Sequence, residues 1–197
     1  MNAAGRLFLE RGVIDTTVED IAKQAGYSKS TVYSYFSSKI DIDNAIACNA
    51  MVVLKDRVAE AIESREQFHD QFEALCATVA EFQRDNPYCF KRLTEKIDYS
   101  LDPDEQTPWL YEVYVAGEQL NATIRDFVRR GMDLGILRQD LPVHRTFLVL
   151  WFAISGLVQV SAYKETYIGH SLSISLDEFL QYGLRVLLRA FEESSEH

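Results

Sequence analysis

Residues 17–39 constrain the fold of this chain more than any other stretch. Thr17 is a suitable N-cap, and Asp20 three residues later completes a capping-box pattern. Gly26 stands where a helix would end on a left-handed residue, and Ser28 is placed to cap a second helix. The apolar residues that recur at helical spacing are Val18, Ile21, Ala22, Ala25, Val32 and Phe36. The stretch is therefore predicted to form two short helices joined by a tight turn.

The predicted outward face of this hairpin carries hydroxyl and ammonium groups and no carboxylate. Its residues are Tyr27, Lys29, Ser30, Thr31, Tyr33, Ser34, Tyr35 and Lys39. No Asp or Glu occurs from residue 21 to residue 40, although the chain holds 30 acidic residues in 197. Lysines release the counterions of a phosphate backbone, and hydroxyls donate to phosphate oxygens. The face therefore suits DNA, which the second helix of a helix-turn-helix enters through the major groove. The alternative is an ordinary helical hairpin with a solvated polar face.

The charge of the chain is unevenly distributed. The net charge of −10 argues against nucleic acid only when the chain is taken as a whole. Residues 1–47 carry five basic and six acidic groups, whereas residues 48–197 carry 15 basic and 24 acidic groups. The acidity thus belongs to the C-terminal part, which repels DNA and helps to orient the hairpin toward it.

A dense set of short motifs fills residues 4–47. The motifs are Leu7-Phe8, Glu10-Arg11-Gly12, Thr16-Thr17-Val18, Ile21-Ala22, Gly26-Tyr27-Ser28-Lys29, Thr31-Val32-Tyr33, Tyr35-Phe36 and Ser38-Lys39. Together they resemble the DNA-binding domain of TetR-type repressors. The resemblance implies an all-α, homodimeric transcriptional regulator that responds to a small molecule. It further implies an N-terminal three-helix helix-turn-helix domain followed by a larger helical domain for ligand binding and dimerisation.

The outward face and the resemblance together give DNA-binding roles to Thr17, Tyr27, Ser28, Lys29, Ser30, Thr31, Tyr33, Ser34, Tyr35 and Lys39. The residues expected to approach bases are Lys29, Ser30 and Ser34 at base edges and Tyr27 at a thymine methyl group. The matching family positions imply phosphate contacts for Thr17, Thr31, Tyr33, Tyr35 and Lys39. Two recognition helices in a dimer would lie ~35 Å apart and read a near-palindromic double-stranded operator. Family members usually begin several residues earlier, so the native chain is expected to extend upstream of Met1 or to bind DNA less tightly.

The rest of the chain also reads as helices. They are expected at residues 2–10, 39–65, 66–86, 88–99 and 107–135, and again after residues 141 and 175. A polar loop is expected at residues 100–106. We place the DNA-binding domain at residues 1–47 and the effector-binding and dimerisation domain at residues 48–197. The long helix from residue 39 would join them and act as a lever.

Residues 146–163 contain no charged side chain, which meets the crude length criterion for a membrane span. Polar residues interrupt the stretch, and Arg145 and Lys164 bracket it, so we interpret it as a buried helix that faces a core and a second subunit. Paired with the last helix, it would form a four-helix bundle across a two-fold axis, packing inside one subunit being the alternative. The predicted interface residues are Trp151, Ser155, Gln159, Leu180, Gly183, Leu184 and Leu187.

Chemistry-bearing motifs are scarce. The sequence has no phosphate loop, nucleophile elbow or zinc-protease motif, so we predict no catalytic residue, no cofactor and no enzyme activity. Four scattered histidines predict no metal site. Three cysteines without a paired spacing, and no signal peptide, predict reduced thiols in the cytoplasm.

An effector pocket is expected from the resemblance, among aromatic residues with a few polar neighbours. The candidate residues are Phe68, Phe72, Cys76, Phe90, Tyr99, Trp109, Tyr114 and Asn121. The predicted function is a ligand-responsive regulator, a repressor released from its operator by a small, largely apolar molecule. The alternative is a helical small-molecule-binding protein or enzyme without DNA-binding activity.

Overall fold

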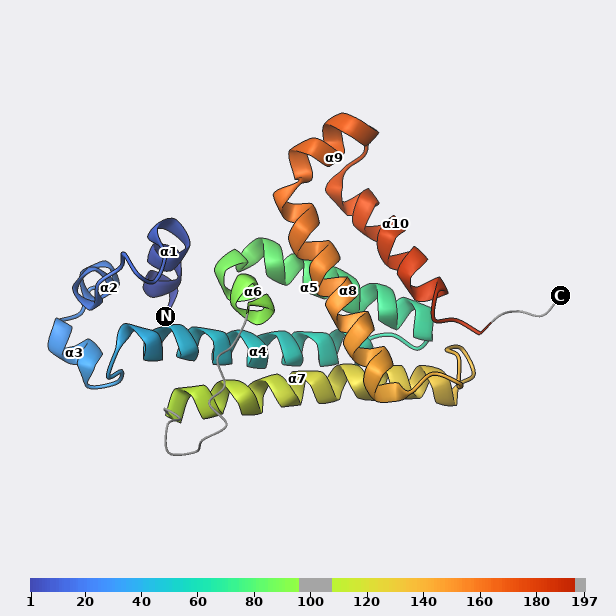
Figure 1. Cartoon of the computed structure of the whole chain (residues 1–197), viewed down its shortest axis with the longest axis horizontal. Coiled ribbons are helices and arrows are strands. Elements are labelled where there is room, and N and C mark those ends of the chain that lie inside the picture. Colours follow the sequence, from blue (N-terminus) through green and yellow to red (C-terminus); the bar gives the residue numbers. More distant parts are fainter. Residues whose placement is uncertain (96–107, 194–197) are drawn as a thin grey trace. The chain divides into compact units, whose positions relative to one another are not determined.

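The computed structural model describes residues 1–95 and 108–193, and within them the chain forms helices and no β-strand (Figure 1). The elements are α1 (Asn2–Arg11), α2 (Val18–Ala25), α3 (Lys29–Tyr33), α4 (Lys39–Glu63), α5 (Phe68–Asp85), α6 (Pro87–Thr94), α7 (Pro108–Asp133), α8 (Val143–Tyr163), α9 (Glu165–Leu172) and α10 (Leu176–Arg189). The expected all-α class is confirmed. The loop expected at residues 100–106 lies outside the described residues.

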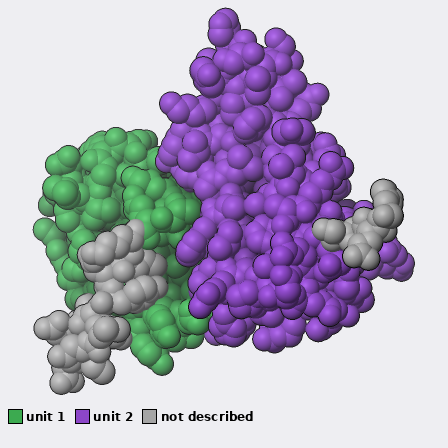
Figure 2. All heavy atoms as spheres, turned by 45° about the vertical axis from the view of Figure 1, so that its right-hand side comes forward, with its two compact units in different colours: residues 1–53, 86–118 green, residues 54–85, 119–197 purple. Residues whose placement is uncertain are grey.

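The chain divides into two compact units, coloured separately in Figure 2. Unit 1 comprises residues 1–53 and 86–118, and unit 2 comprises residues 54–85 and 119–197. Helix α6 belongs to the same unit as the helix-turn-helix, although it follows α5 in sequence. Compactness therefore groups the chain differently from the predicted boundary at residue 47, which was a division by function and stays a prediction.

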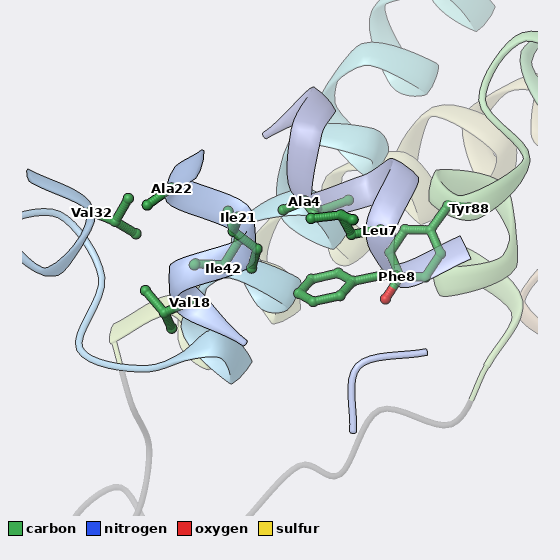
Figure 3. Close-up of a cluster of buried hydrophobic side chains, with 10 residues drawn as sticks. Ala4, Leu7, Phe8, Val18, Ile21, Ala22, Val32, Ile42 and Tyr88 are labelled. Carbon is green, nitrogen blue, oxygen red and sulfur yellow. The ribbon is translucent and has the colours of Figure 1, made fainter. Parts of the chain in front are cut away.

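The core of unit 1 forms where α1, α2, α4 and α6 present their apolar residues to one another (Figure 3). The cluster consists of Ala4, Leu7, Phe8, Val18, Ile21, Ala22, Val32, Ile42, Ile46 and Tyr88. The Phe8 and Tyr88 ring centroids lie 5.7 Å apart, which joins α6 to α1. Burial of these faces is what holds the short helices, because helices of this length are marginal alone in water.

Unit 2 is built around the apolar stripe of α5, whose buried residues include Phe68, Phe72, Leu75, Val79 and Phe82. Phe68 stacks on Phe127 of α7 with a centroid distance of 4.6 Å and an interplanar angle of 8°. Gly131, one turn further along α7, permits this contact: a Cβ atom there would lie 2.5 Å from Phe68 Cζ. The contact of Phe68, at the start of α5, with α7 thus depends on the absence of a side chain at Gly131.

Helices α8, α9 and α10 run up, across and back in Figure 1, and α8 packs on both α5 and α10. Among the described residues, α8 is long and apolar enough to span a membrane by length and composition. One side of it, with Phe147, Ile154 and Val158, is buried in unit 2. Its other side leaves Phe152 and Val160 exposed, so a single subunit covers only part of the predicted all-round apolar surface.

Most helix boundaries agree with the sequence prediction to within two residues, because caps mark them. Ser175 and Glu178 form a capping box at the start of α10, which begins where the sequence predicts a helix after residue 175. Helix α9 was not predicted, and the structure explains why: it has no side-chain cap, and it ends at Ser173 with φ at 56°, where glycine or asparagine is usual. The helix predicted at residues 88–99 ends earlier than expected: α6 stops at Thr94, and Glu95 has an extended backbone with φ at −83° and ψ at 159°. Residues 96–99 lie outside the described residues.

We expect Gly131→Ala to lower the free energy of unfolding by about 1–3 kcal/mol, because the new methyl group overpacks a site between buried Phe68 and Leu137. Urea unfolding followed by circular dichroism measures this. Gly5→Ala is the matched control, since its Cβ would lie 3.9 Å from the nearest side-chain atom and a helical alanine is favoured over glycine. Equal stability of the Gly131 variant and the wild type would refute the close-packing argument.

Candidate DNA interface and effector site

Helix α2 begins and ends as the sequence predicts. Thr17 Oγ1 accepts a hydrogen bond from the Asp20 backbone N–H at 3.1 Å, and Asp20 Oδ2 accepts from the Thr17 backbone N–H at 3.1 Å. These bonds from Thr17 lower the pKa of Asp20, so its carboxylate is ionised at neutral pH and the cap is intact. Gly26 ends α2 with φ at 74° and ψ at 25°, the left-handed conformation. The turn that aims α3 is therefore fixed at both of its ends.

Helix α3 is held by its own hydroxyls. Ser28 Oγ accepts from the Thr31 backbone N–H at 3.1 Å and lies 2.8 Å from the hydroxyls of both Ser30 and Thr31. Ser34 Oγ donates to the Thr31 carbonyl at 2.7 Å. These bonds order the polar face while the residues remain largely at the surface. Only Val32 of α3 is buried.

Three tyrosines stand exposed around α3. Tyr27, Tyr33 and Tyr35 have exposed fractions of 65%, 47% and 73%. Large amphipathic side chains left in solvent within one short stretch are typical of a contact surface. Lys29 projects beside them, with its ammonium 3.8 Å from the carboxylate of Glu19 on α2. Both side chains are exposed, so this ion pair contributes little to the stability of the fold and leaves the Lys29 ammonium available to another anion.

Lys39 has a different position from the one expected of a phosphate ligand. Its Nζ donates to the carbonyl of Ile14 at 2.6 Å and to that of Thr16 at 3.1 Å. Thr16 is fully buried, and its hydroxyl donates to the Gly12 carbonyl at 2.8 Å. Lys39 thus ties the start of α4 to the loop before α2. An ammonium has three donors, so one remains for a phosphate, and that role stays a prediction.

A buried carboxylate that the sequence prediction did not single out joins α4 to α6. Asp43 accepts a hydrogen bond from Tyr88 Oη at 2.6 Å and forms an ion pair with Arg92 Nε at 3.1 Å. Burial and the bond to Asp43 raise the pKa of Tyr88, so its hydroxyl stays protonated and donates. The signal in the sequence is a charge within the apolar stripe of α4, between Ile42 and Ile46.

The predicted effector residues are divided between the two units. Phe72 and Cys76 line a cavity of about 510 Å³ between α5 and α10, and burial raises the pKa of the Cys76 thiol, which keeps it neutral. Phe68 lies in the core of unit 2, and Asn121 is half-buried there.

Three other predicted effector residues belong to unit 1. Phe90 is buried in unit 1, where Trp109 packs on Phe36 with a centroid distance of 5.6 Å and Tyr114 is largely exposed. Tyr99 is outside the described residues. The α5–α10 cavity also has a charged rim that the sequence prediction missed, with Arg84 and Asp177 paired across it at 2.7 Å. Nothing local in the sequence brings these two distant residues together.

The comparisons with known proteins agree with this geometry. Residues 1–46 match the family described as "Bacterial regulatory proteins, tetR family", which covers α1 to α3 and the start of α4. Through its helix-turn-helix, the chain resembles the TetR family of transcriptional regulators.

Several relatives resemble the chain beyond its helix-turn-helix. The transcriptional regulator YhgD of Bacillus subtilis is 26% identical over 76% of either chain. The activator FasR of Mycolicibacterium smegmatis is 26% identical over 84% of this chain and 68% of its own length. The repressor KstR2 of Rhodococcus jostii is 26% identical over 90% of this chain and 87% of its own. Every one of these names describes a regulator of transcription and none describes an enzyme.

Solved structures share the whole fold. The regulator FadR from Bacillus subtilis, in complex with stearoyl-CoA, superposes with a TM-score of 0.72 at 18% identity, covering 100% of this chain and 97% of that one. The SmeT–triclosan complex superposes with a TM-score of 0.71 at 21% identity, covering 98% of this chain and 90% of that one. At these identities the likeness establishes the two-part helical TetR fold.

The predicted interface residues lie mostly inside one subunit. Trp151, Ser155, Leu180 and Leu184 are buried, and Gln159 and Leu187 are half-buried. Gly183 does mark a close helix approach, but to Leu157 of the same subunit: a Cβ atom there would lie 2.9 Å from Leu157 Cδ2. The apolar residues left exposed on these helices are Leu148, Val149, Phe152, Val160, Tyr163, Tyr182 and Val186.

We expect Lys39→Met to lower the free energy of unfolding by about 1 kcal/mol, because two backbone carbonyls lose a charged donor. Thermal unfolding measures the loss. Lys23→Met on α2 is the control, as this exposed side chain has no hydrogen bond to those carbonyls. A Lys39 variant as stable as the control would contradict the tethering role.

We expect Tyr88→Phe to lower the free energy of unfolding by about 1–2 kcal/mol, because Asp43 loses the hydrogen bond that the buried tyrosine hydroxyl donates. The measurement is urea unfolding, with exposed Tyr111→Phe as the matched control in the same unit. If Tyr88→Phe costs nothing further in a chain that already carries Asp43→Asn, the two residues are coupled. Independent, additive losses would show that the bond is of no consequence.

Proposed function

We propose that this TetR-type regulator is a cytoplasmic homodimeric repressor that leaves a near-palindromic operator when a small, largely apolar effector binds. The observation that carries the proposal is the face of α3, where exposed Lys29, Tyr33 and Tyr35 surround hydroxyls on a helix fixed by caps. Such a face combines cationic, hydroxyl and aromatic groups that contact phosphates and base edges. Its nearest acids are Glu19, which pairs loosely with Lys29, and Asp20, which is engaged in the α2 cap.

The DNA contacts follow from the positions along α3. Lys29, Ser30 and Ser34 read base edges, and Tyr27 contacts a thymine methyl group. The residues that position the protein on phosphates are Thr17, Thr31, Tyr33, Tyr35 and the remaining donor of Lys39. Ser28 serves as the cap that orients them.

Dimerisation supplies the second recognition helix. We assign the interface to the apolar residues that one subunit leaves exposed on α8 and α10, with Phe152, Val160 and Val186 among them. A contiguous exposed apolar face is unusual on a monomer and typical of an isologous helix–helix interface. This assignment replaces buried Trp151 and Leu180 at the predicted interface by residues on the exposed side of the same helices.

The effector acts by favouring one separation of the two recognition helices over another. FadR and SmeT have been captured with stearoyl-CoA and triclosan, whose bodies are largely apolar, which supports an effector of that character. The sign of regulation rests on analogy with KstR2, named a repressor, whereas FasR is named an activator. Reporter transcription from the operator with and without this protein decides between the two.

The test is binding of the purified dimer to the DNA that flanks its own gene, across a salt series with nonspecific competitor. We expect saturable, salt-steep and sequence-selective binding. Lys29→Ala should weaken the free energy of operator binding by about 1–3 kcal/mol and relax the sequence preference at the base that Lys29 contacts. Tyr33→Phe should weaken binding about equally on every sequence. Lys164→Ala, after the end of α8, is the control and should leave binding unchanged. Absence of selective binding would favour the alternative of a ligand-binding protein without DNA-binding activity.

A further inference from the structure

Two buried polar atoms on α8 have no hydrogen-bond partner among residues 1–95 and 108–193. They are Ser155 Oγ and Gln159 Oε1. The residues are four positions apart, so they lie one turn apart on the same face of the helix, with about 6 Å between neighbouring side chains. Leaving a buried polar group unpaired is unfavourable, and two on one face of an otherwise uncharged stretch indicate a requirement other than packing.

Ser155 also lacks the local bond that usually satisfies a hydroxyl within a helix. A helical Ser or Thr commonly donates to the carbonyl four residues earlier. Thr146 does so on the same helix, with Oγ1 at 3.0 Å from the Pro142 carbonyl, and Thr123 of α7 does so with the Gln119 carbonyl at 3.2 Å. Ser155 makes no such bond, so both its donor and its acceptor capacity remain open to another molecule.

A second subunit is poorly placed to satisfy these atoms. Ser155 has an exposed fraction of 4% within one subunit, so its own chain already covers it. The face assigned to the dimer contains Phe152 and Val160, which are 64% and 57% exposed. Gln159 Oε1 is likewise buried, although the rest of the Gln159 side chain is partly exposed beside Val160. The two unpaired atoms therefore belong to the interior of the ligand-responsive body.

We propose that Ser155 and Gln159 bind the polar group of the effector, and that this group is a neutral hydrogen-bond donor on an otherwise apolar molecule. This inference rests on the proposed effector-responsive function. Gln159 Oε1 only accepts hydrogen bonds, so its ligand must supply an O–H or N–H. The helix carries no charged side chain between Arg145 and Lys164, so these residues favour an alcohol, a phenol or an amide over a carboxylate. Apolar surface supplies affinity and the donor supplies specificity, as in most small-molecule sites.

The experiment uses pairs of ligands that differ only in the donor: nonylphenol with its methyl ether, and dodecanol with its methyl ether. Binding to the full-length protein is followed by thermal shift, and release of the operator by fluorescence anisotropy. We expect the phenol or the alcohol to stabilise the protein and release DNA, and its ether to act about tenfold more weakly, the worth of a buried hydrogen bond. Equal action of the two members of each pair, or no action of either donor, would overturn the proposal.

Variants locate the effect. Ser155→Ala and Gln159→Met should each weaken the response to the active donor about tenfold without lowering the melting temperature, because each removes an unpaired atom. Thr146→Val is the matched control on the same helix and should leave the response unchanged. A lower melting temperature together with an unchanged response would show that a buried water satisfies these atoms, which overturns the ligand role.

Failure of this inference differs visibly from failure of the proposed function. Selective operator binding that no donor compound relieves would remove the role of Ser155 and Gln159 and leave the regulator intact. Absence of selective operator binding by the wild type would remove the regulator itself.

Discussion

The arrangement of unit 1 depends on the hydrogen bonds that the buried carboxylate of Asp43 accepts. It lies in α4 and takes bonds from both Tyr88 and Arg92 of α6. The ring of Tyr88 packs in turn on Phe8 of α1. One carboxylate therefore connects, within this unit, α4, which follows the helix-turn-helix, with α6, which packs on α1. A buried charge is tolerated only when its partners are present, so this network permits few alternative packings.

The helix-turn-helix rests on a second set of polar contacts. Lys39 holds the carbonyls of the loop before α2, the capping box starts that helix, and Gly26 turns the chain toward α3. Each of these devices is local or nearly so, and each fixes backbone direction with a hydrogen bond or a permitted φ. The hydroxyls of α3 bond to one another and to the Thr31 carbonyl at the surface, which orders the proposed DNA face in the free protein.

The parts that sequence reasoning predicted are those that local chemistry determines. Thr17, Gly26, Ser28 and Ser175 mark helix ends within a few residues of their partners, so the element boundaries could be read directly. The sequence does not show which residues pair across the tertiary structure. The pairing of Asp43 with Arg92, and of Arg84 with Asp177, joins residues far apart in sequence. The same limit applies to α8, since an apolar helix shows its composition but not which of its faces its own subunit covers. Four of the seven predicted interface residues are accordingly buried within one subunit, and the other three are half-buried.

The two tryptophans of the chain fall one in each compact unit. Trp109 lies in unit 1 against Phe36, and Trp151 is buried in unit 2. Their indoles therefore provide two intrinsic fluorophores in different surroundings, and replacing either one by Phe isolates the emission of the other unit. The intrinsic fluorescence of the protein can therefore show whether unit 1 and unit 2 unfold in a single cooperative step or in succession.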